Sequence, residues 1–166
     1  MSAGGSAVNE AHKAALAAGV LERKAAYARR RSESFDKGVE GERLVAQALA
    51  PLTTRGGFVL HDRALAHGGN IDHLVVGSGG VTVVDAKHWM SPVSVRDDLR
   101  VASRSAMRAA DHLADLTAQV RASMVEARID LSVTGILVFT HDTNASMPRQ
   151  HLGDIDLVGL HHLYRS

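Results

Sequence analysis

Hydrophobic residues recur along this chain with two different periods, and the change of period divides it into helices and strands. Between residues 101 and 127 the apolar side chains are spaced three and four apart, which predicts a long amphipathic helix. Residues 133–140 form an almost continuous apolar run, the pattern of a strand that is buried on both faces. The apolar face of the predicted helix consists of Met107, Ala110, Leu113, Leu116, Val120 and Met124.

Two further strands are predicted from β-branched residues, at Ile71–Val76 and at Val81–His88. The segment between them is Gly77-Ser78-Gly79-Gly80, and glycine supplies the positive φ that a tight turn requires. The sequence therefore predicts a β-hairpin. Shorter strands are expected at residues 58–62, 93–95 and 156–160.

The first fifty residues are expected to be helical in two parts. Residues 8–31 are strongly helix-forming, and a second helix is predicted over residues 37–50, ending at Pro51. Residues 32–36 should form a boundary between them, with Ser34 or Asp36 as the N-cap of the second helix. We predict one α/β domain over residues 35–166, with a mixed β-sheet flanked by helices, and an N-terminal helical extension over residues 1–34.

Composition limits the class of protein but does not by itself identify a function. With 166 residues, 45% of them hydrophobic, the chain is long enough for one domain with a buried core. No apolar run of about 18 residues occurs, so no membrane association is expected. The first residues lack the features of a secretory signal, and the absence of cysteine excludes disulfides and thiolate metal sites. A cytoplasmic location is the expectation that remains.

Positive charge is concentrated near the N-terminus, although the net charge is only +1. The segment Glu22–Arg31 carries five basic residues and one acidic residue, which suits contact with phosphates and equally suits a solvated helix face. Both interpretations remain open. Residues 8–31 are also the candidate surface for a protein partner or a homodimer.

The predicted hairpin brings two carboxylates together. A symmetric turn pairs Val76 with Val81 and places Asp72 opposite Asp85. Directly opposed residues have Cβ atoms roughly 4.5–5.5 Å apart, so the two carboxylates would repel one another unless a cation lay between them. Oxygen ligands at this spacing predict a site for a hard divalent cation.

Two more charged residues are predicted to join this site. Lys87 follows Asp85 by two positions, so both side chains lie on one face of the strand, where an ammonium can stabilise a phosphate or help to position and deprotonate water. On the preceding helix, a rotation of about 100° per residue places Glu42 in the middle of an apolar face. That face consists of Val39, Val45, Ala46 and Leu49, all within about 60° of Glu42. The same rotation places Glu40 on the opposite, solvated face. A carboxylate is rarely buried without a partner, which favours Glu42 as a third acidic member.

Three segments resemble the nuclease-related domain (NERD) family of the PD-(D/E)xK superfamily. They are GVEGE (Gly38–Glu42), NIDHLVVGSGGV (Asn70–Val81) and VVDAKHW (Val83–Trp89). The resemblance covers residues 36–160 and implies a restriction-endonuclease-like fold, Mg²⁺ or Mn²⁺ as cofactor, and a role in DNA processing. It assigns the family's roles to Glu42, Asp72, Asp85 and Lys87. Gln119, on the long helix, resembles a glutamine that often lies near such sites.

The resulting hypothesis is metal-dependent hydrolysis of phosphodiester bonds in nucleic acid, with DNA favoured over RNA. Asp72 and Asp85 are expected to hold the ion, Glu42 and the backbone carbonyl of Ala86 to complete its ligands, and Lys87 to stabilise charge at the scissile phosphate. Two alternatives remain open. One is a catalytically silent nucleic-acid-binding module, and the other is an interaction or sensor subunit that docks through residues 8–31.

Overall fold

The computed structural model describes the backbone of residues 5–65 and 68–163, and the side chains from residue 22 onward apart from that of residue 30. Two units are present, Met1–Lys37 and Gly38–Ser166. The side chains of residues 8–21 lie outside the described part, so the docking role expected of residues 8–31 stays a prediction.

The predicted break in the N-terminal helix is wrong. Helix α1 (Gly5–Leu49) passes through Ser32–Asp36 without interruption, and Ser34 and Asp36 are exposed helical residues, not caps. This segment contains neither glycine nor proline, and the helix propensities of its residues are only moderately low, so nothing in it forces the helix to stop. The predicted stop at Pro51 is confirmed, because α1 ends at Leu49 and a short 3₁₀ helix follows.

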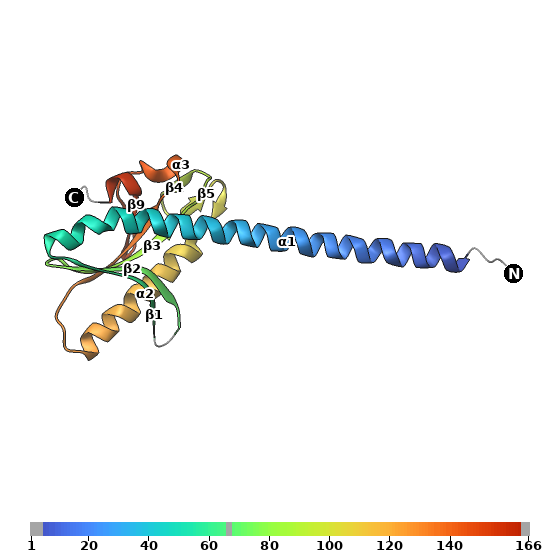
Figure 1. Cartoon of the computed structure of the whole chain (residues 1–166). Coiled ribbons are helices and arrows are strands. Elements are labelled where there is room, and N and C mark those ends of the chain that lie inside the picture. The colour runs from blue at the N-terminus through green and yellow to red at the C-terminus, as the bar shows by residue number, and fades with distance from the viewer. Residues whose placement is uncertain (1–4, 66–67, 164–166) are drawn as a thin grey trace. The chain divides into compact units, whose positions relative to one another are not determined.

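A mixed β-sheet forms the centre of the second unit (Figure 1). It has six strands in the order β1-β2-β3-β7-β9-β8. The first three strands are antiparallel, β3, β7 and β9 are parallel, and β8 pairs antiparallel with β9. The strands are β1 (Phe58–Ala64), β2 (Asn70–Gly77), β3 (Gly80–Lys87), β7 (Val133–Phe139), β8 (Gln150–Leu152) and β9 (Ile155–Gly159).

Helices cover both faces of this sheet. On one face, α2 (Met107–Glu126) packs on a core that includes Val83 and Leu137. On the other face, the last turns of α1 pack through Val45 and Leu49 on a second core. The apolar face predicted for the long helix is confirmed: four of its six residues are buried, and Met107 and Met124 pack half-buried against the same core.

A small antiparallel sheet lies between β3 and α2 in the sequence. It consists of β4 (Val93–Val95), β5 (Leu99–Val101) and β6 (Arg104–Ser105). Only β4 was expected, and the predicted helix start at residue 101 is wrong. Ala102 adopts a φ of +52° in the β5–β6 turn, which is incompatible with a helix, so α2 begins at Met107. The remaining elements are α3 (Asp142–Ala145) and the 3₁₀ helices η1 (Ala50–Arg55) and η2 (Leu160–His162).

Candidate active site

The predicted hairpin register is confirmed as far as it extends. Val76 pairs with Val81, and the ladder continues to the pair formed by His73 and Val84. It ends there, so Asp72 and Asp85 do not form the directly opposed backbone pair that the sequence predicts. Instead, Oδ2 of Asp72 accepts a hydrogen bond of 2.9 Å from the backbone amide of Ala86. The carboxylate of Asp72 thus takes the place of the backbone carbonyl that would accept from this amide if the β-ladder continued.

The chain is irregular on both sides of this point, which explains the departure. Strands β1 and β2 pair in a regular register, but Asp62 and Asp72 do not form the pair that this register would give. Asp62 also has a φ of +52°. Ile71 packs in the same core as Leu74, although strict alternation would place the two residues on opposite faces. Such irregularities re-aim side chains at strand ends and are common beside active sites.

Asp85 and Lys87 form an ion pair at the end of β3, as their spacing predicts. Nζ of Lys87 lies 2.6 Å from Oδ2 of Asp85, and the two side chains are 24% and 8% exposed. The site therefore contains a buried carboxylate whose close partner among the described residues is the ammonium of Lys87.

The surroundings of Asp85 favour its neutral form. Burial raises the pKa of the Asp85 carboxyl; Lys87 opposes this rise, and the nearby charge of Asp72 adds to it. The interaction with Asp72 shows that the two carboxylates are neighbours even though their backbones are not paired. A cation placed between them would remove the cost of ionising Asp85.

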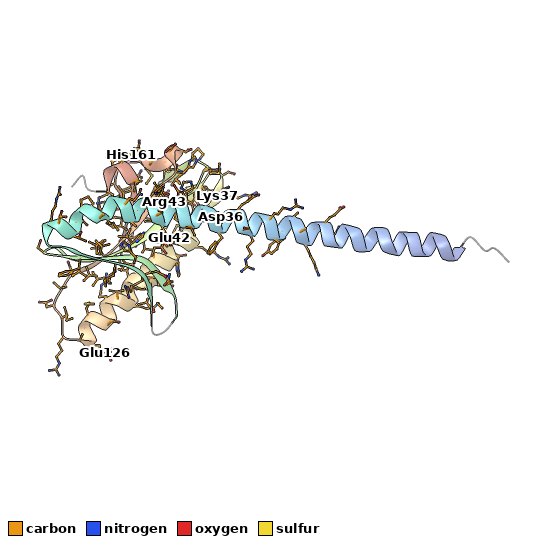
Figure 2. All side chains as sticks on the ribbon, viewed as in Figure 1. Asp36, Lys37, Glu42, Arg43, Glu126 and His161 are labelled. Atoms are coloured by element: carbon orange, nitrogen blue, oxygen red, sulfur yellow. The ribbon has the colours of Figure 1, made fainter. Side chains whose placement is uncertain are left out.

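Glu42 lies at the rim of this group and not in the middle of the apolar face. The buried face of α1 consists of Gly41, Val45 and Leu49, and Glu42 is exposed. The prediction of a buried Glu42 is therefore wrong, because the buried stripe is centred one residue earlier than the helical rotation suggested. Glu42 nevertheless lies on α1 next to the strands (Figure 2), and its pKa is raised by partial burial and by the charges of Asp72, Asp62 and Asp85.

Glu40 has different surroundings, as the sequence predicts. Its carboxylate accepts hydrogen bonds of 2.8 and 2.7 Å from the guanidinium of Arg43, and this contact lowers its pKa. Both side chains are largely solvated. Glu40 is therefore a surface residue of the same helix, and it provides a matched control for Glu42.

Gly41 explains how α1 comes so close to the site. A Cβ atom on this residue would lie 3.2 Å from Cβ of His88 and 3.3 Å from Oγ1 of Thr140. Only glycine leaves room for the helix backbone against the ends of β3 and β7 without displacing these atoms. The second glycine of the GVEGE motif thus positions Glu42 beside the strands.

No hydrogen bond or ion pair between described residues links Gln119 to this group. It is a half-buried residue of α2, and its Oε1 atom is buried without a hydrogen-bond partner among the residues that the structure describes. Its role near the site stays a prediction that rests on the resemblance alone.

Two residues near the site were not predicted. His112, on α2, is close enough to Asp85 for its charge to lower the pKa of that carboxyl. The negative charge of Asp62 raises the pKa of Glu42. Asp62 is held by a hydrogen bond of 2.7 Å from Nδ2 of Asn70. The sequence offered no signal for either residue. Asp62 looked like an ordinary turn residue, and the approach of His112 to Asp85 depends on how α2 packs on the sheet.

The donor set suits a hard cation, but it is incomplete without further ligands. In the described part of the chain, no three His, Cys, Asp or Glu side chains converge as a ready metal site. Asp72 and Asp85 supply carboxylate oxygens, one of which, Oδ2 of Asp85, is buried beside the ammonium of Lys87. Oxygen donors of this kind match Mg²⁺ or Mn²⁺, both of which complete their coordination with water and substrate oxygens.

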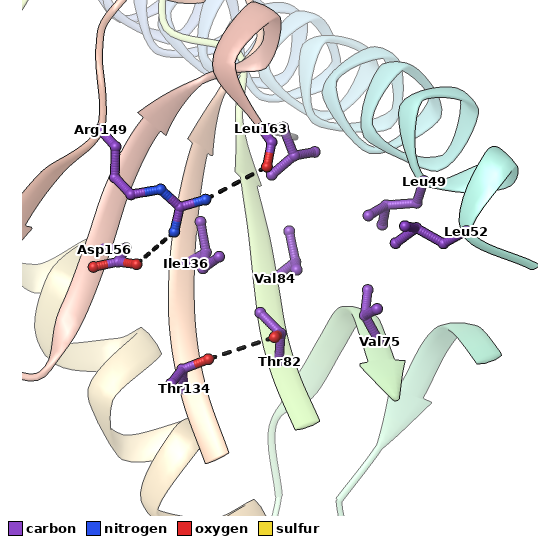
Figure 3. Close-up of a pocket in the computed structure, with 10 residues that line it drawn as sticks. All are labelled: Leu49, Leu52, Val75, Thr82, Val84, Thr134, Ile136, Arg149, Asp156 and Leu163. Carbon is purple, nitrogen blue, oxygen red and sulfur yellow. Dashed lines mark hydrogen bonds and ion pairs between the residues drawn. The ribbon is translucent and has the colours of Figure 1, made fainter. Parts of the chain in front are cut away.

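A separate pocket of about 380 Å³ lies over the first halves of β3 and β7 (Figure 3). Its floor includes Thr82, Val84 and Ile136, and the ion pair between Arg149 and Asp156, 2.6 Å long, closes one side. Asp85 and Lys87 lie at the opposite end of β3 and do not line this pocket.

One family model matches the chain, and it covers more than half of it. The model is described as the nuclease-related domain, and the match spans residues 37–140, from the last turns of α1 to the residue after β7. Comparison with curated proteins and with solved structures gives no match. None of the helices within the described residues has the length and apolar character needed to cross a membrane.

Proposed function

The chain belongs to the nuclease-related domain family, and from this membership we propose that it is a metal-dependent nuclease that hydrolyses phosphodiester bonds, with DNA as its substrate. The fold is restriction-endonuclease-like, with a mixed sheet between helices. One observation carries the proposal beyond the family: a buried aspartate, a second aspartate and a lysine meet where β3 ends.

Each of these residues suits one part of the reaction. Asp72, Asp85 and the backbone carbonyl of Ala86 would hold Mg²⁺ or Mn²⁺, with Glu42 as a further ligand through water. When bound, the ion would supply an activated water and charge stabilisation for the leaving oxygen. Lys87 carries an ammonium group, which cannot be a metal ligand, and it would stabilise negative charge on the scissile phosphate.

The partly exposed position of Glu42 supports a role through water. Its pKa is raised by partial burial and by the negative charges of Asp72, Asp62 and Asp85, so it tends to bind a proton or a cation. A carboxylate at the rim of such a group can accept a proton from water that approaches the phosphate.

The test is cleavage of supercoiled and linear DNA by the full chain with Mg²⁺, with Mn²⁺ and with chelator. We expect metal-dependent cleavage by the wild type and none by Asp85→Asn. DNA binding without cleavage under any metal would instead identify a catalytically silent binding module. The absence of both would favour an interaction subunit. RNA of the same sequence, offered in parallel, tests the choice of DNA.

A further inference from the structure

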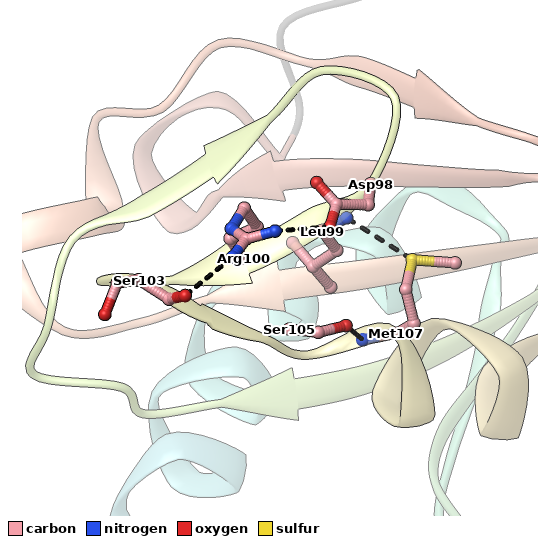
Figure 4. A network of polar contacts seen from close by, with 6 residues as sticks. All are labelled: Asp98, Leu99, Arg100, Ser103, Ser105 and Met107. Atoms are coloured by element: carbon pink, nitrogen blue, oxygen red, sulfur yellow. Dashed lines mark hydrogen bonds and ion pairs between the residues drawn. The ribbon is translucent and has the colours of Figure 1, made fainter.

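Two exposed arginines lie at the start of α2 and in the short strand just before it. Arg104 is in β6, and Arg108 is in the first turn of α2. Neither side chain makes an ion pair or a hydrogen bond with any residue that the structure describes. The neighbouring Arg100 differs, because its guanidinium donates to Asp98 at 2.9 Å and to the carbonyl of Ser103 at 2.7 Å (Figure 4). Arg100 therefore stabilises the turn, whereas Arg104 and Arg108 have no structural task.

The path of the chain places Arg108 at the same edge of the sheet as the site. Helix α2 connects the end of β3 to the start of β7, and near its last turns Arg121 donates to the carbonyl of Val133 at 3.1 Å. Its first turns therefore lie at the edge where β3 ends in Asp85 and Lys87. His112 is one turn after Arg108, on the same side of the helix and about 6 Å along the axis. The effect of His112 on Asp85 agrees with this placement.

The position of Arg108 is unfavourable for the helix on its own. The first turn of α2 contains no acidic residue, although acidic residues are preferred there and cations are disfavoured by the helix dipole. The acid that could compensate, Asp111, makes no ion pair with Arg108 within the described part of the chain. A cation at a helix N-terminus that no ion pair compensates is unfavourable for folding, and such residues are expected at functional surfaces.

The small sheet holds this region firmly. Leu99 is fully buried, and its carbonyl accepts from the amide of Ala106 at 2.8 Å. Its own amide donates to Sδ of Met107 at 3.3 Å (Figure 4). The backbone that carries the two arginines is therefore held in place, which limits the backbone entropy lost when they bind a ligand.

We propose that Arg104 and Arg108 bind the phosphate backbone of the nucleic acid next to the bond that is cut. This inference rests on the proposed function, and it adds a substrate-binding surface to the site. Guanidinium groups that have no internal partner bind phosphate oxygens through charge-assisted hydrogen bonds. Contacts of this kind position the duplex without selecting its sequence.

The experiment measures duplex DNA binding by the full chain, in chelator, over a range of salt concentrations. The double variant Arg104→Gln/Arg108→Gln should bind roughly tenfold more weakly or worse at low salt. The slope of log affinity against log salt should fall by about 2, because two phosphate contacts are lost. The matched control is Arg55→Gln/Arg128→Gln, which removes the same charge from two exposed arginines, Arg55 before β1 and Arg128 after α2.

The outcomes separate this inference from the proposed function. Equal losses in the two double variants would overturn the inference, as would a wild type that does not bind duplex DNA. Partial recovery by Arg104→Lys/Arg108→Lys, with unchanged thermal melts, would support it and exclude a folding defect. Arginine-dependent binding without cleavage under any metal would refute the proposed nuclease activity and would leave only phosphate binding by the two arginines, with no bond cut beside them.

Discussion

Replacing Asp85 with asparagine tests whether the site is built for a cation. The substitution removes one charge at nearly constant volume from a side chain that is 8% exposed. Repulsion between neighbouring carboxylates costs about 0.2–1 kcal/mol when they are exposed, and more when they are buried. The loss of Lys87 as a partner opposes this gain, although Lys87 is 24% exposed and can turn towards water.

The direction of the pKa shift of Asp85 decides whether the substitution stabilises or destabilises the folded protein. Because the pKa is raised, burial and Asp72 together outweigh the attraction of Lys87, and the ionised carboxyl destabilises the folded state. Without metal, Asp85→Asn should therefore be as stable as the wild type, or more stable by up to about 1 kcal/mol. For a chain of this size, that difference corresponds to roughly 2–4 °C in Tm. The advantage should be absent below pH 3.8, the ordinary value for the group, and should grow as the pH rises through the raised pKa.

Metal should reverse the order of stability. An ion at a hundred times its Kd stabilises the folded state by about 2.7 kcal/mol, which corresponds to roughly 5–10 °C here. The assay is a set of thermal melts of both proteins, with chelator and with excess Mn²⁺. We expect the wild type to gain Tm with Mn²⁺ and Asp85→Asn to lose most of this gain. If the wild type does not respond to metal, or the variant responds equally, Asp85 is not a ligand.

Lys87→Ala should abolish cleavage and leave the Mn²⁺-induced rise in Tm largely intact, since an ammonium is no metal ligand; unchanged cleavage would remove Lys87 from the mechanism. Glu42→Gln should reduce cleavage strongly, whereas Glu40→Gln should not, because Glu40 is engaged by Arg43 at the surface; equal rates in the two variants would exclude Glu42. Deletion of residues 8–31 should weaken DNA binding and flatten its salt dependence without unfolding the second unit, and a truncated chain that fails to fold would refute this. Gly41→Val should lower Tm, because its Cβ would lie 3.2 Å from Cβ of His88, and an unchanged melt would show that α1 can move away.

The sequence predicted the parts of the site that depend on local geometry. A glycine-rich turn and strand alternation were sufficient to pair Val76 with Val81 and to place Lys87 beside Asp85. The point at which β2 and β3 stop pairing could not be predicted. It depends on the side chain of Asp72, which accepts a hydrogen bond that a backbone carbonyl would otherwise accept. The contribution of His112 was missed for a similar reason, since it arises only when α2 crosses back over β3.

The helix phase of α1 shows where periodicity fails. Val39 and Val45 together suggested a stripe centred on Glu42, but Val39 is 50% exposed and the buried stripe passes through Gly41. A glycine adds no hydrophobic signal, although here it marks the closest approach of the helix to the strands. A prediction from hydropathy alone therefore places the buried face of α1 one residue too far along the helix.

The hydrogen bond from the amide of Ala86 to Asp72 determines how a mutational scan of this domain should be interpreted. Truncating Asp72 to alanine removes a carboxylate and also leaves a half-buried peptide group unsatisfied, which costs about 1–3 kcal/mol. An inactive Asp72→Ala protein would thus combine a chemical defect with an architectural one. Asparagine keeps an acceptor oxygen for the amide and removes only the charge. The differences in stability and in activity between Asp72→Ala and Asp72→Asn therefore separate the structural role of this residue from its role in the reaction.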